Sequence, residues 1–507
     1  MQIQVRDPDG RPIPRINLRI IEGTKAEPVL DDAEFDYDTD ASGNKGWPIK
    51  YWPTNQPYTL HVNAADINPT FETIRWDIPA GCQEDIVITL PRVSAPVRVV
   101  VTRIGTPQAD GRGFRDEAGR FYPLGQTLFW ALDGWRNDRE RLKQQWAWLG
   151  PKHGFDYQRI LADVGWPTQP IDSSASDFED VLAAVIDCAY DDFGLRTEVT
   201  VWGGSDPQKP RDPLRAARRV AGVVRGRQHK VMHLEAGNES FQNGPPDATL
   251  DEMVRILRDA HPLVAASSPQ TDFPTWLRAR TVNGASLSTA HFDRSTGDED
   301  WRFVRQVWDA RDWGFLMSNN EGKGPRSSVS ETTSIPRLVL HRALGLLCGV
   351  SAFVLHNAVG VTGRVDPAHN RPANLWEVPG IDELMVALRR LDAWLPDDIH
   401  TWEKTTQHGG DTSIGPHPLR ADAIWSDGAD HGVSRCYAGV RGDRFVSLVL
   451  GVKKWTDLLA RASCELEVIN VGTTERTPVH VNAGERYRLV TGQDNADAGF
   501  LIRGRLV

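Results

Sequence analysis

The chain has 507 residues, of which 40% are hydrophobic and 25% charged, as is ordinary for folded globular proteins. One compact core rarely takes so many residues, so we expect about two to four domains. The formal net charge of −10 argues against nucleic acid or an anionic membrane as the main partner.

Targeting and redox signals are weak. No run of 18 apolar residues predicts a transmembrane helix, and the N-terminus, MQIQVRDPDG, lacks the basic and apolar regions of a signal peptide. We therefore expect a cytoplasmic protein, or one that is virion-associated or released by a non-classical route. The cysteines are odd in number and lack CxxC spacing, which indicates buried thiols in a reduced protein rather than disulfides or a zinc site: Cys82, Cys188, Cys348, Cys436 and Cys464.

The first 92 residues are predicted to be all-β. Short runs (QIQV, INLRIIE, YTLHV, DIVITLP) are separated by the turn sequences DPDG, TDASGN, PTNQP and PAG. This spacing predicts a small antiparallel sandwich over residues 1–95. The segments VRDPDGRPIPRINLRI and TDASGNKGWPI resemble the transthyretin-like modules of carboxypeptidase regulatory domains. Docking to a larger assembly through this module is a further expectation.

The middle of the chain has a different pattern. After a strand-like VRVVVTR (97–103), apolar runs alternate with amphipathic helical stretches from about 120 to 395. Eight strands alternating with helices predict a (β/α)8 barrel over residues 96–397. A doubly wound open sheet is the competing fold, but no GxGxxG turn follows the first strand. The strand candidates are PLGQTLFWAL, FDYQRILAD, RTEVTVWGG, KVMHLEAG, PLVAASS, SLSTAHF, GFLMSNNE and SAFVLHNA.

Helices are equally clear between several of these strands. SDFEDVLAAVIDCAYDDFG is expected to begin after Ser176 or Asp177 as its N-cap. RAARRVAGVVRGR carries its basic residues on what we interpret as the solvated face of a barrel helix. Beyond residue 398 the helical pattern ends, and runs such as RFVSLVLGV, CELEVINVG and FLIRGRLV predict a C-terminal β-sandwich over residues 398–507. The expected fold is a TIM barrel flanked by two sandwiches.

Barrels of this type place their active sites at the C-terminal ends of the strands. Strand 4 ends on Asn238 and Glu239, and strand 7 on Asn320 and Glu321. Asn238 and Glu239 are either an ordinary start of a loop or the working end of a catalytic strand. The other polar or aromatic residues at these ends are Trp130 and Asp133 on strand 1, Arg159 on strand 2, Trp202 on strand 3, His291 on strand 6, and His356 and Asn357 on strand 8.

Two carboxylic acids facing each other suit acetal hydrolysis. One protonates the leaving oxygen while the other attacks or activates water. Arg159 would keep the attacking carboxylate ionised, and His291 could donate to it or orient it. Glu239 would need a raised pKa, obtained by partial burial near Trp residues and by the charge of Glu321.

The barrel region resembles the clan A retaining glycoside hydrolases. The matching segments are FRDEAGRFYPLGQT (114–127), similar to their opening hairpin and first strand, and the residues Arg159, Gly237-Asn238-Glu239, His291 and Glu321. The resemblance implies Glu239 as acid/base, Glu321 as nucleophile and Asn238 as ligand of the sugar 2-hydroxyl. The implied substrate is a β-linked oligo- or polysaccharide, with no cofactor or metal.

One departure concerns the floor of the sugar site. These enzymes often carry a Trp at the end of strand 8, whereas this chain reads SAFVLHNAVG and offers His356. Trp376, in the following NRPANLWEVPG, is a candidate substitute. The residues considered for sugar stacking are Trp130, Trp135, Trp202 and Trp376.

Other interpretations stay open. A non-catalytic carbohydrate-binding or virion-surface protein could use the barrel as a scaffold, and a carboxylate separation beyond about 6.5 Å would favour an inverting hydrolase. His229 and His233 are expected on one strand, without metal-binding geometry. Glu235 is expected to face the barrel wall or a partner arginine. No GxSxG or GxxxxGK[ST] motif indicates a serine hydrolase or a nucleotide site.

Overall fold

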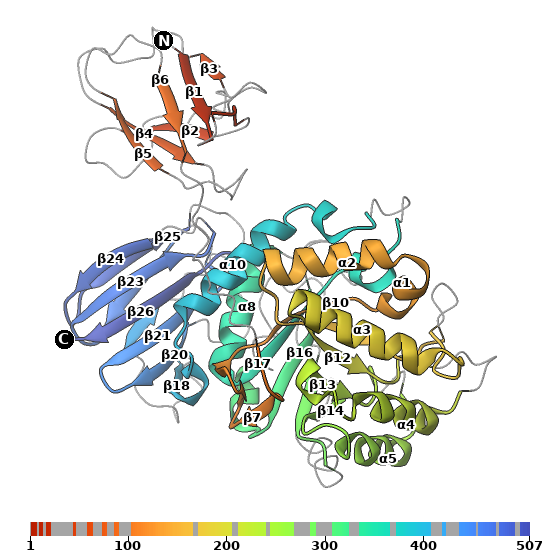
Figure 1. Cartoon of the computed structure of the whole chain (residues 1–507). Coiled ribbons are helices and arrows are strands. Elements are labelled where there is room, and N and C mark those ends of the chain that lie inside the picture. The colour runs from red at the N-terminus through yellow and green to blue at the C-terminus, as the bar shows by residue number, and fades with distance from the viewer. Residues whose placement is uncertain are drawn as a thin grey trace. The chain divides into compact units, whose positions relative to one another are not determined.

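In the computed structural model (Figure 1), the chain forms two compact units, Met1–Val97 and Arg98–Val507. The structure describes residues 2–7, 10–13, 17–21, 44–46, 58–63, 74–78, 86–90, 103–165, 171–204, 211–239, 244–267, 284–290, 307–323, 334–365, 372–406, 418–421, 436–452, 455–472, 476–491 and 497–507. The first unit is described only in parts, and the strand expected over 97–103 lies almost wholly outside the described residues.

The first unit contains two three-stranded sheets, with the orders β3-β1-β6 and β2-β4-β5. The second sheet is antiparallel, whereas β1 pairs with β6 in parallel. The prediction of a purely antiparallel module was therefore wrong for the first sheet, because β6 returns beside β1 only after a long connection, which permits parallel pairing. The strands are β1 Gln2–Arg6, β2 Asn17–Ile21, β3 Asn44–Gly46, β4 Tyr58–Asn63, β5 Ile74–Ile78 and β6 Ile86–Thr89.

The second unit is built around a closed barrel of eight parallel strands. Six strands fall within their predicted runs, while β16 extends two residues past its run and β17 begins one residue before its run. The barrel is therefore confirmed and the open sheet is excluded. The strands are β10 Leu124–Thr127, β11 Tyr157–Leu161, β12 Arg196–Thr200, β13 Val231–Glu235, β14 Val264–Ser267, β15 Leu287–Ala290, β16 Leu316–Lys323 and β17 Val350–His356.

Helices cover the outside of the barrel (Figure 1). The described ones are α1 Ala131–Asn137, α2 Arg139–Ala147, α3 Phe178–Phe193, α4 Pro213–Val224, α5 Asp247–Arg258, α8 Ile335–Cys348, α9 Ala358–Thr362 and α10 Ile381–Trp394, with the short helical turns η2 Trp148–Lys152, η3 Gln228–Lys230, η4 Ala310–Asp312, η6 Leu375–Glu377 and η7 Ile399–Thr401. Helix α3 begins after Asp177 as expected, but the Asp177 carboxylate binds Arg136 instead of capping the backbone.

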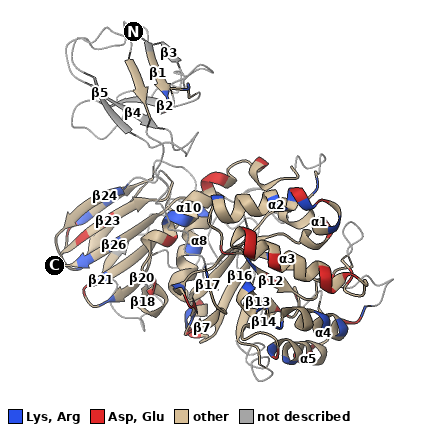
Figure 2. Ribbon diagram, viewed as in Figure 1, with Lys and Arg blue, Asp and Glu red and all other residues tan. Residues whose placement is uncertain are grey.

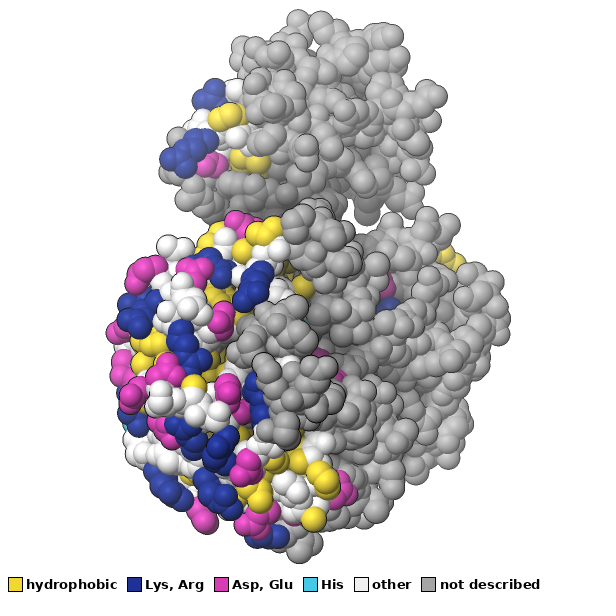
Figure 3. All heavy atoms as spheres, turned by 90° about the vertical axis from the view of Figure 1, so that its right-hand side faces the viewer, with side chains coloured by type: hydrophobic (Ala, Val, Ile, Leu, Met, Phe, Trp, Pro, Cys, Tyr) yellow, Lys and Arg dark blue, Asp and Glu magenta, His cyan; other side chains and the backbone are white. Residues whose placement is uncertain are grey.

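Charges of opposite sign join neighbouring helices. Figure 2 shows acidic residues on α3 and basic ones on α4. Arg219 of α4 binds Glu179 of α3, and Arg227, just beyond α4, lies 3.0 Å from Asp187. The small apolar residues of α4 are buried, so the predicted solvated basic face of this helix is confirmed. On the described part of the face in Figure 3, both signs of charge are interspersed.

A small three-stranded sheet (β7 Gln108–Asp110, β8 Gly113–Asp116, β9 Gly119–Phe121) precedes the barrel. Its Phe114 and Phe121 share a buried apolar cluster with the early residues of several barrel strands, among them Met232 and Leu316. Asp116, buried beside them, lies 2.8 Å from Arg196 at the start of β12. This sheet therefore seals the N-terminal end of the barrel, opposite the end where an active site is expected.

The C-terminal part contains a six-stranded antiparallel sheet and a three-stranded one, with the orders β18-β20-β21-β26-β23-β24 and β19-β22-β25. The fold is thus a central TIM barrel with flanking β-rich domains. The strands are β18 Glu403–Thr406, β19 Leu419–Ala421, β20 Cys436–Arg441, β21 Arg444–Val449, β22 Trp455–Ala460, β23 Cys464–Asn470, β24 Arg476–Val481, β25 Arg486–Val490 and β26 Phe500–Leu506.

Within the six-stranded sheet, β21 is buried on both faces after its first residue, which explains its nearly continuous apolar run. Phe445 and Val449 of β21 belong to the core of the two C-terminal sheets. Val446 and Leu448, on the other face of the same strand, belong to the barrel core. One face of the six-stranded sheet therefore belongs to the barrel core, and the other forms a separate core with the three-stranded sheet. The exact domain limits of 1–95, 96–397 and 398–507 stay predictions.

Two smaller expectations concern membranes and thiols. None of the helices in the described segments is long and apolar enough to cross a membrane. Four of the five cysteines lie in the described residues, and all four are free thiols. Cys82 lies outside these segments.

Candidate active site

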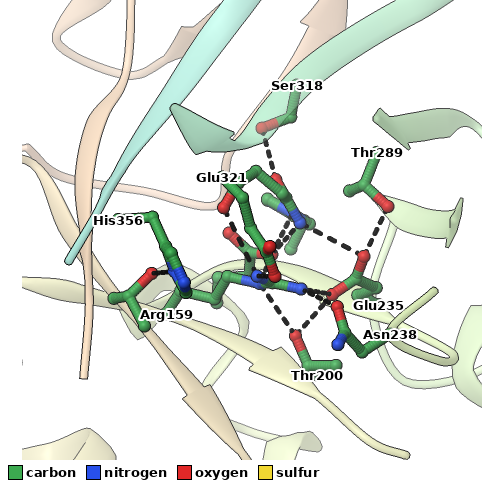
Figure 4. Close-up of polar contacts among 12 residues, drawn as sticks. Arg159, Thr200, Glu235, Asn238, Thr289, Ser318, Glu321 and His356 are labelled. Carbon is green, nitrogen blue, oxygen red and sulfur yellow. Dashed lines mark hydrogen bonds and ion pairs between the residues drawn. The ribbon is translucent and has the colours of Figure 1, made fainter. Parts of the chain in front are cut away.

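Arg159 is the centre of a polar cluster inside the barrel (Figure 4). It projects from β11 and is 0% exposed. Its two terminal nitrogens contact residues of β16, of β13 and of the loop that follows β13. Nη1 lies 3.2 Å from Oε1 of Glu321 on β16. Nη2 donates to Oδ1 of Asn238 and to Oε2 of Glu235, both at 2.8 Å. Arg159 thereby brings together two other sequence-predicted residues, Glu321 and Asn238, and the carboxylate of Glu235 on β13.

The register of the strands explains why these side chains meet. Arg159 stands opposite Glu198 in the pairing of β11 with β12, and Thr200 stands opposite Glu235 in the pairing of β12 with β13. Residues paired across parallel strands point to the same side of the sheet, and every second residue of a barrel strand faces the interior. All four are buried, so they form one inward-facing polar layer.

Glu235 receives donors on both oxygens. Oε2 accepts from Arg159 and from the Thr200 hydroxyl at 2.5 Å. Oε1 accepts from the Thr289 hydroxyl and, at 3.2 Å, from the Asn320 amide. Burial by itself raises the pKa of Glu235, but the charge of Arg159 and the hydroxyl donors outweigh it and hold this pKa below its ordinary value. The expected partnership of Glu235 with an arginine is confirmed.

Glu198 is the third carboxylate on the same guanidinium. Its Oε1 lies 3.1 Å from Nε of Arg159 and accepts from the Asn320 amide at 2.7 Å. Nε2 of His233 lies 3.3 Å from the same oxygen. Burial by itself lowers the pKa of Arg159, but the three surrounding carboxylates, with Glu235 first and then Glu198 and Glu321, raise it above its ordinary value. Arg159 therefore stays protonated.

Glu239 has an unusual backbone. Its φ is 45°, and among the described residues it is the only non-glycine with a positive φ. Such conformations cost free energy and cluster at functional sites. The N–H of the preceding Asn238 donates to the Trp202 carbonyl at 2.7 Å, which ties this turn to the end of β12. Glu239 is 6% exposed, so its carboxyl group is largely shielded from bulk water.

A bulge positions Glu321. The pairing of β16 with β17 shifts register between Asn319 and Gly322, and bulges often redirect side chains beside active sites. A Cβ on Gly322 would lie 2.2 Å from the Phe353 ring, so only glycine fits at this point of the bulge. Glu321 is 4% exposed and points toward Arg159 in Figure 4.

His356 lies at the end of β17, on the same side of the barrel. Its Nδ1 is 3.0 Å from the Thr127 hydroxyl, and its ring centroid is 5.8 Å from that of Phe129. The Phe129 ring in turn lies 5.0 Å from the Arg159 guanidinium carbon. His356 is thus part of the wall around the arginine, and its contact with a sugar stays a prediction.

The tryptophans expected to stack on sugar are mostly covered. Trp130 is 2% exposed and Trp202 is 4% exposed, and the guanidinium of Arg141 lies 4.4 Å from the Trp130 ring centroid. Trp376 and Trp135 are partly buried against the barrel core. Their sugar-binding roles stay predictions, and His291 lies outside the described residues.

Sequence reasoning placed Asn320 at the end of its strand but missed other members of the polar layer: Glu198, Thr200, Thr289 and Ser318. One available signal was the pair Glu198 and Thr200, two polar residues at alternate positions of the strand RTEVT. The expectation for the two histidines was partly wrong, because His229 lies in the turn η3 with its ring at 5.5 Å from Tyr190. Within the described residues, no group of three or more His, Cys, Asp or Glu could hold a metal ion.

Comparisons with known proteins support the fold. No protein-family model and no curated protein matches the sequence. A solved structure of a glycoside hydrolase family 5 protein from Bacteroides vulgatus is 14% identical, with a TM-score of 0.56, and the match covers 79% of this chain and 93% of that one. A second structure, described as a glycoside hydrolase, is 13% identical with a TM-score of 0.53, covering 79% and 96%. At these identities the likeness shows the shared barrel architecture.

Proposed function

We propose that the chain is a glycoside hydrolase that cleaves β-glycosidic bonds of an oligo- or polysaccharide with retention of configuration. The observation that carries this proposal is a pair of buried carboxyl residues, Glu239 just after β13 and Glu321 on β16. Arg159 is hydrogen-bonded to Glu321 and to the neighbouring Asn238. The fold shared with two glycoside hydrolases adds support. Fold alone fixes no function, so the proposal depends on the two carboxyl groups.

In the proposed reaction, Glu321 attacks the anomeric carbon as a carboxylate while Glu239 protonates the departing glycosidic oxygen. A covalent glycosyl-enzyme forms, and Glu239 then takes a proton from the water that releases the sugar. The positive charge of Arg159, 3.2 Å from Glu321, favours the ionised form of the nucleophile. The strained turn at Glu239 fixes the direction from which its proton arrives.

Asn238 is proposed to bind the sugar 2-hydroxyl. Its side-chain oxygen accepts from Arg159, and its backbone N–H donates to Trp202. Asn238 is therefore held through its backbone and through its side-chain oxygen, which leaves the side-chain NH2 group as the proposed donor to the substrate. Hydrogen bonds to the 2-hydroxyl strengthen in the transition state of such reactions.

A substrate screen tests the proposal. Wild type, Glu239→Ala, Glu321→Ala and the exposed-site control Glu465→Ala are assayed on aryl β-glycosides and β-linked polysaccharides. We expect activity in wild type and the control, none in Glu321→Ala, and azide rescue of Glu239→Ala on an activated aryl substrate. Turnover that survives in either alanine variant would show that the pair is misassigned.

Stereochemistry is tested on the same reaction. The anomer released first, followed by proton NMR, is expected to keep the β configuration. Release of the α anomer would instead indicate an inverting hydrolase. Binding of glycan without turnover, equal in wild type and Glu321→Gln, would favour a non-catalytic carbohydrate-binding protein. The transthyretin-like character of the N-terminal unit, and docking through it, also stay predictions.

A further inference from the structure

Glu198 touches the nucleophile's partners without a role in the proposed chemistry. It is fully buried on β12, and its Oε1 contacts Nε of Arg159 at 3.1 Å and the Asn320 amide at 2.7 Å. Asn320 is the residue before Glu321, and its carbonyl accepts from Nη1 of Arg159. Glu198 therefore lies against both groups that position Glu321.

The two oxygens of Glu198 differ. Oε1 receives all the contacts above, whereas Oε2 accepts no hydrogen bond from any residue that the structure describes. In Glu235, by contrast, each carboxylate oxygen accepts two hydrogen bonds. A carboxylate that uses one oxygen contributes its charge to the cluster but only part of its hydrogen-bonding capacity. Replacing Glu198 by glutamine would keep the oxygen that accepts and remove the charge.

The charges around Arg159 do not balance. Three buried carboxylates, those of Glu198, Glu235 and Glu321, lie within 3.2 Å of one guanidinium. The single positive charge is therefore shared, and each carboxylate also repels the others across a low-dielectric interior. Both effects make proton uptake by Glu321 easier than it would be if Arg159 contacted no other carboxylate.

We propose that Glu198 is a positioning residue of the candidate active site, which holds Arg159 and, by sharing its charge, sets the pH at which Glu321 becomes protonated. This inference rests on the proposed function for its catalytic readout. The other titratable or charged groups facing the cluster are Tyr157 and Arg159 on β11, His233 and Glu235 on β13, Glu239 after β13 and His356 on β17. His291 follows β15, outside the described segments.

The first test is the pH profile of kcat/KM on an aryl β-glycoside, whose acidic limb reports protonation of the free enzyme. Glu198→Gln is expected to move the acidic limb to lower pH by about one unit, because one negative charge near Glu321 is gone. Glu198→Asp keeps the charge and should leave the limb near its wild-type position. Glu198→Met, neutral and without hydrogen-bond demands, replaces the glutamine variant if that one does not fold.

A matched control separates this effect from general damage. Asp116→Asn removes another buried carboxylate, which pairs with Arg196 and Arg103 at the opposite end of the barrel. It is expected to lower the melting temperature and leave the acidic limb unchanged. An unmoved limb in Glu198→Gln, or an equal shift in Glu198→Asp, would overturn the proposal.

A second readout needs no activity. Melting temperatures are compared for wild type, Glu198→Gln, Glu321→Gln and the double variant. Each single change removes the repulsion between the two carboxylates, so the sum of the two single-variant changes counts this relief twice. The double variant gains the relief only once, and it should therefore melt about 2 °C or more below the temperature expected from adding the two single changes. Additive values would contradict the proposal. Coupling without turnover on any glycoside would instead leave Glu198 positioned as described and remove the proposed function.

Discussion

Nη1 of Arg159 lies 3.2 Å from Oε1 of Glu321, although the two residues are 162 positions apart in the sequence. The contact joins the second and seventh strands of the barrel across its interior. Because Arg159 also binds Glu235, Glu198 and Asn238, one side chain determines the geometry of the whole polar layer.

Arg159→Lys should impair both stability and activity. A lysine ammonium cannot reproduce the fork that contacts three strands, so at least one buried carboxylate loses its partner, at a cost of about 3 kcal/mol or more. We expect a fall of at least about 100-fold in kcat/KM through misplacement of Glu321. Arg196→Lys, which disturbs the buried pair with Asp116, should lose stability in urea unfolding and keep kcat within a few-fold of wild type.

Thr200→Val should weaken the site by removing a hydroxyl that contacts both Arg159 and Glu235. The Thr200 hydroxyl donates to Glu235 and accepts from Nε of Arg159. Its loss removes a donor that keeps the pKa of Glu235 low, so this pKa should rise, at a stability cost of about 1–3 kcal/mol.

The control for that change lies on the same strand. The Thr197 hydroxyl, also buried, accepts from the Gln158 amide at 3.2 Å. Thr197→Val should cost a similar free energy of unfolding and leave kcat unchanged. If the two variants lowered kcat equally, the hydroxyl of Thr200 would have no special part in holding Arg159.

His261 should make the fold acid-sensitive. It is buried between α5 and β14, where its ring nitrogens contact the Leu263 amide and the Gln228 carbonyl, and burial lowers its pKa to about 4. An unfolded histidine binds a proton below about pH 6.5. Between these values the unfolded state binds more protons, so stability falls as pH drops through this window, by about 2 kcal/mol at pH 5.

The measurement is urea unfolding of wild type and His261→Gln from pH 8 to pH 5. The variant loses packing and hydrogen bonds at every pH, so the pH 8 difference serves as its baseline. We expect that difference to shrink as the pH falls, because glutamine takes up no proton. A constant difference across the range would mean that the pKa of His261 is the same in the folded and unfolded states.

The barrel was predictable because its determinants are local. Runs such as QRIL, TEVT and VMHLE have the length and composition of buried strands, and the stretches between them repeat with a helical period. Short connections and right-handed crossovers then leave few ways to arrange eight such units. The ends of the strands pointed to Arg159, Asn238 and Glu321, and the structure brings all three into contact.

Features that depend on pairing across long separations were not predictable. The parallel partnership of β1 with β6 and the bulge before Gly322 leave no periodic trace in the sequence. His229 looked like a strand residue because HKVMH has the composition of one, yet the strand begins only at Val231. Local composition does not predict which residue is the first to pair with a neighbouring strand.

The sequence by itself determined the fold class and which strands carry acid, amide and arginine side chains. It could do so because hydrophobic periodicity and turn propensity are local properties of the sequence. Only the tertiary structure decided that Glu198, Glu235 and Glu321 share one guanidinium. That outcome depends on the register between β11, β12 and β13 and on the closure of the barrel. It is these long-range alignments that place three carboxylates from distant segments within 3.2 Å of Arg159.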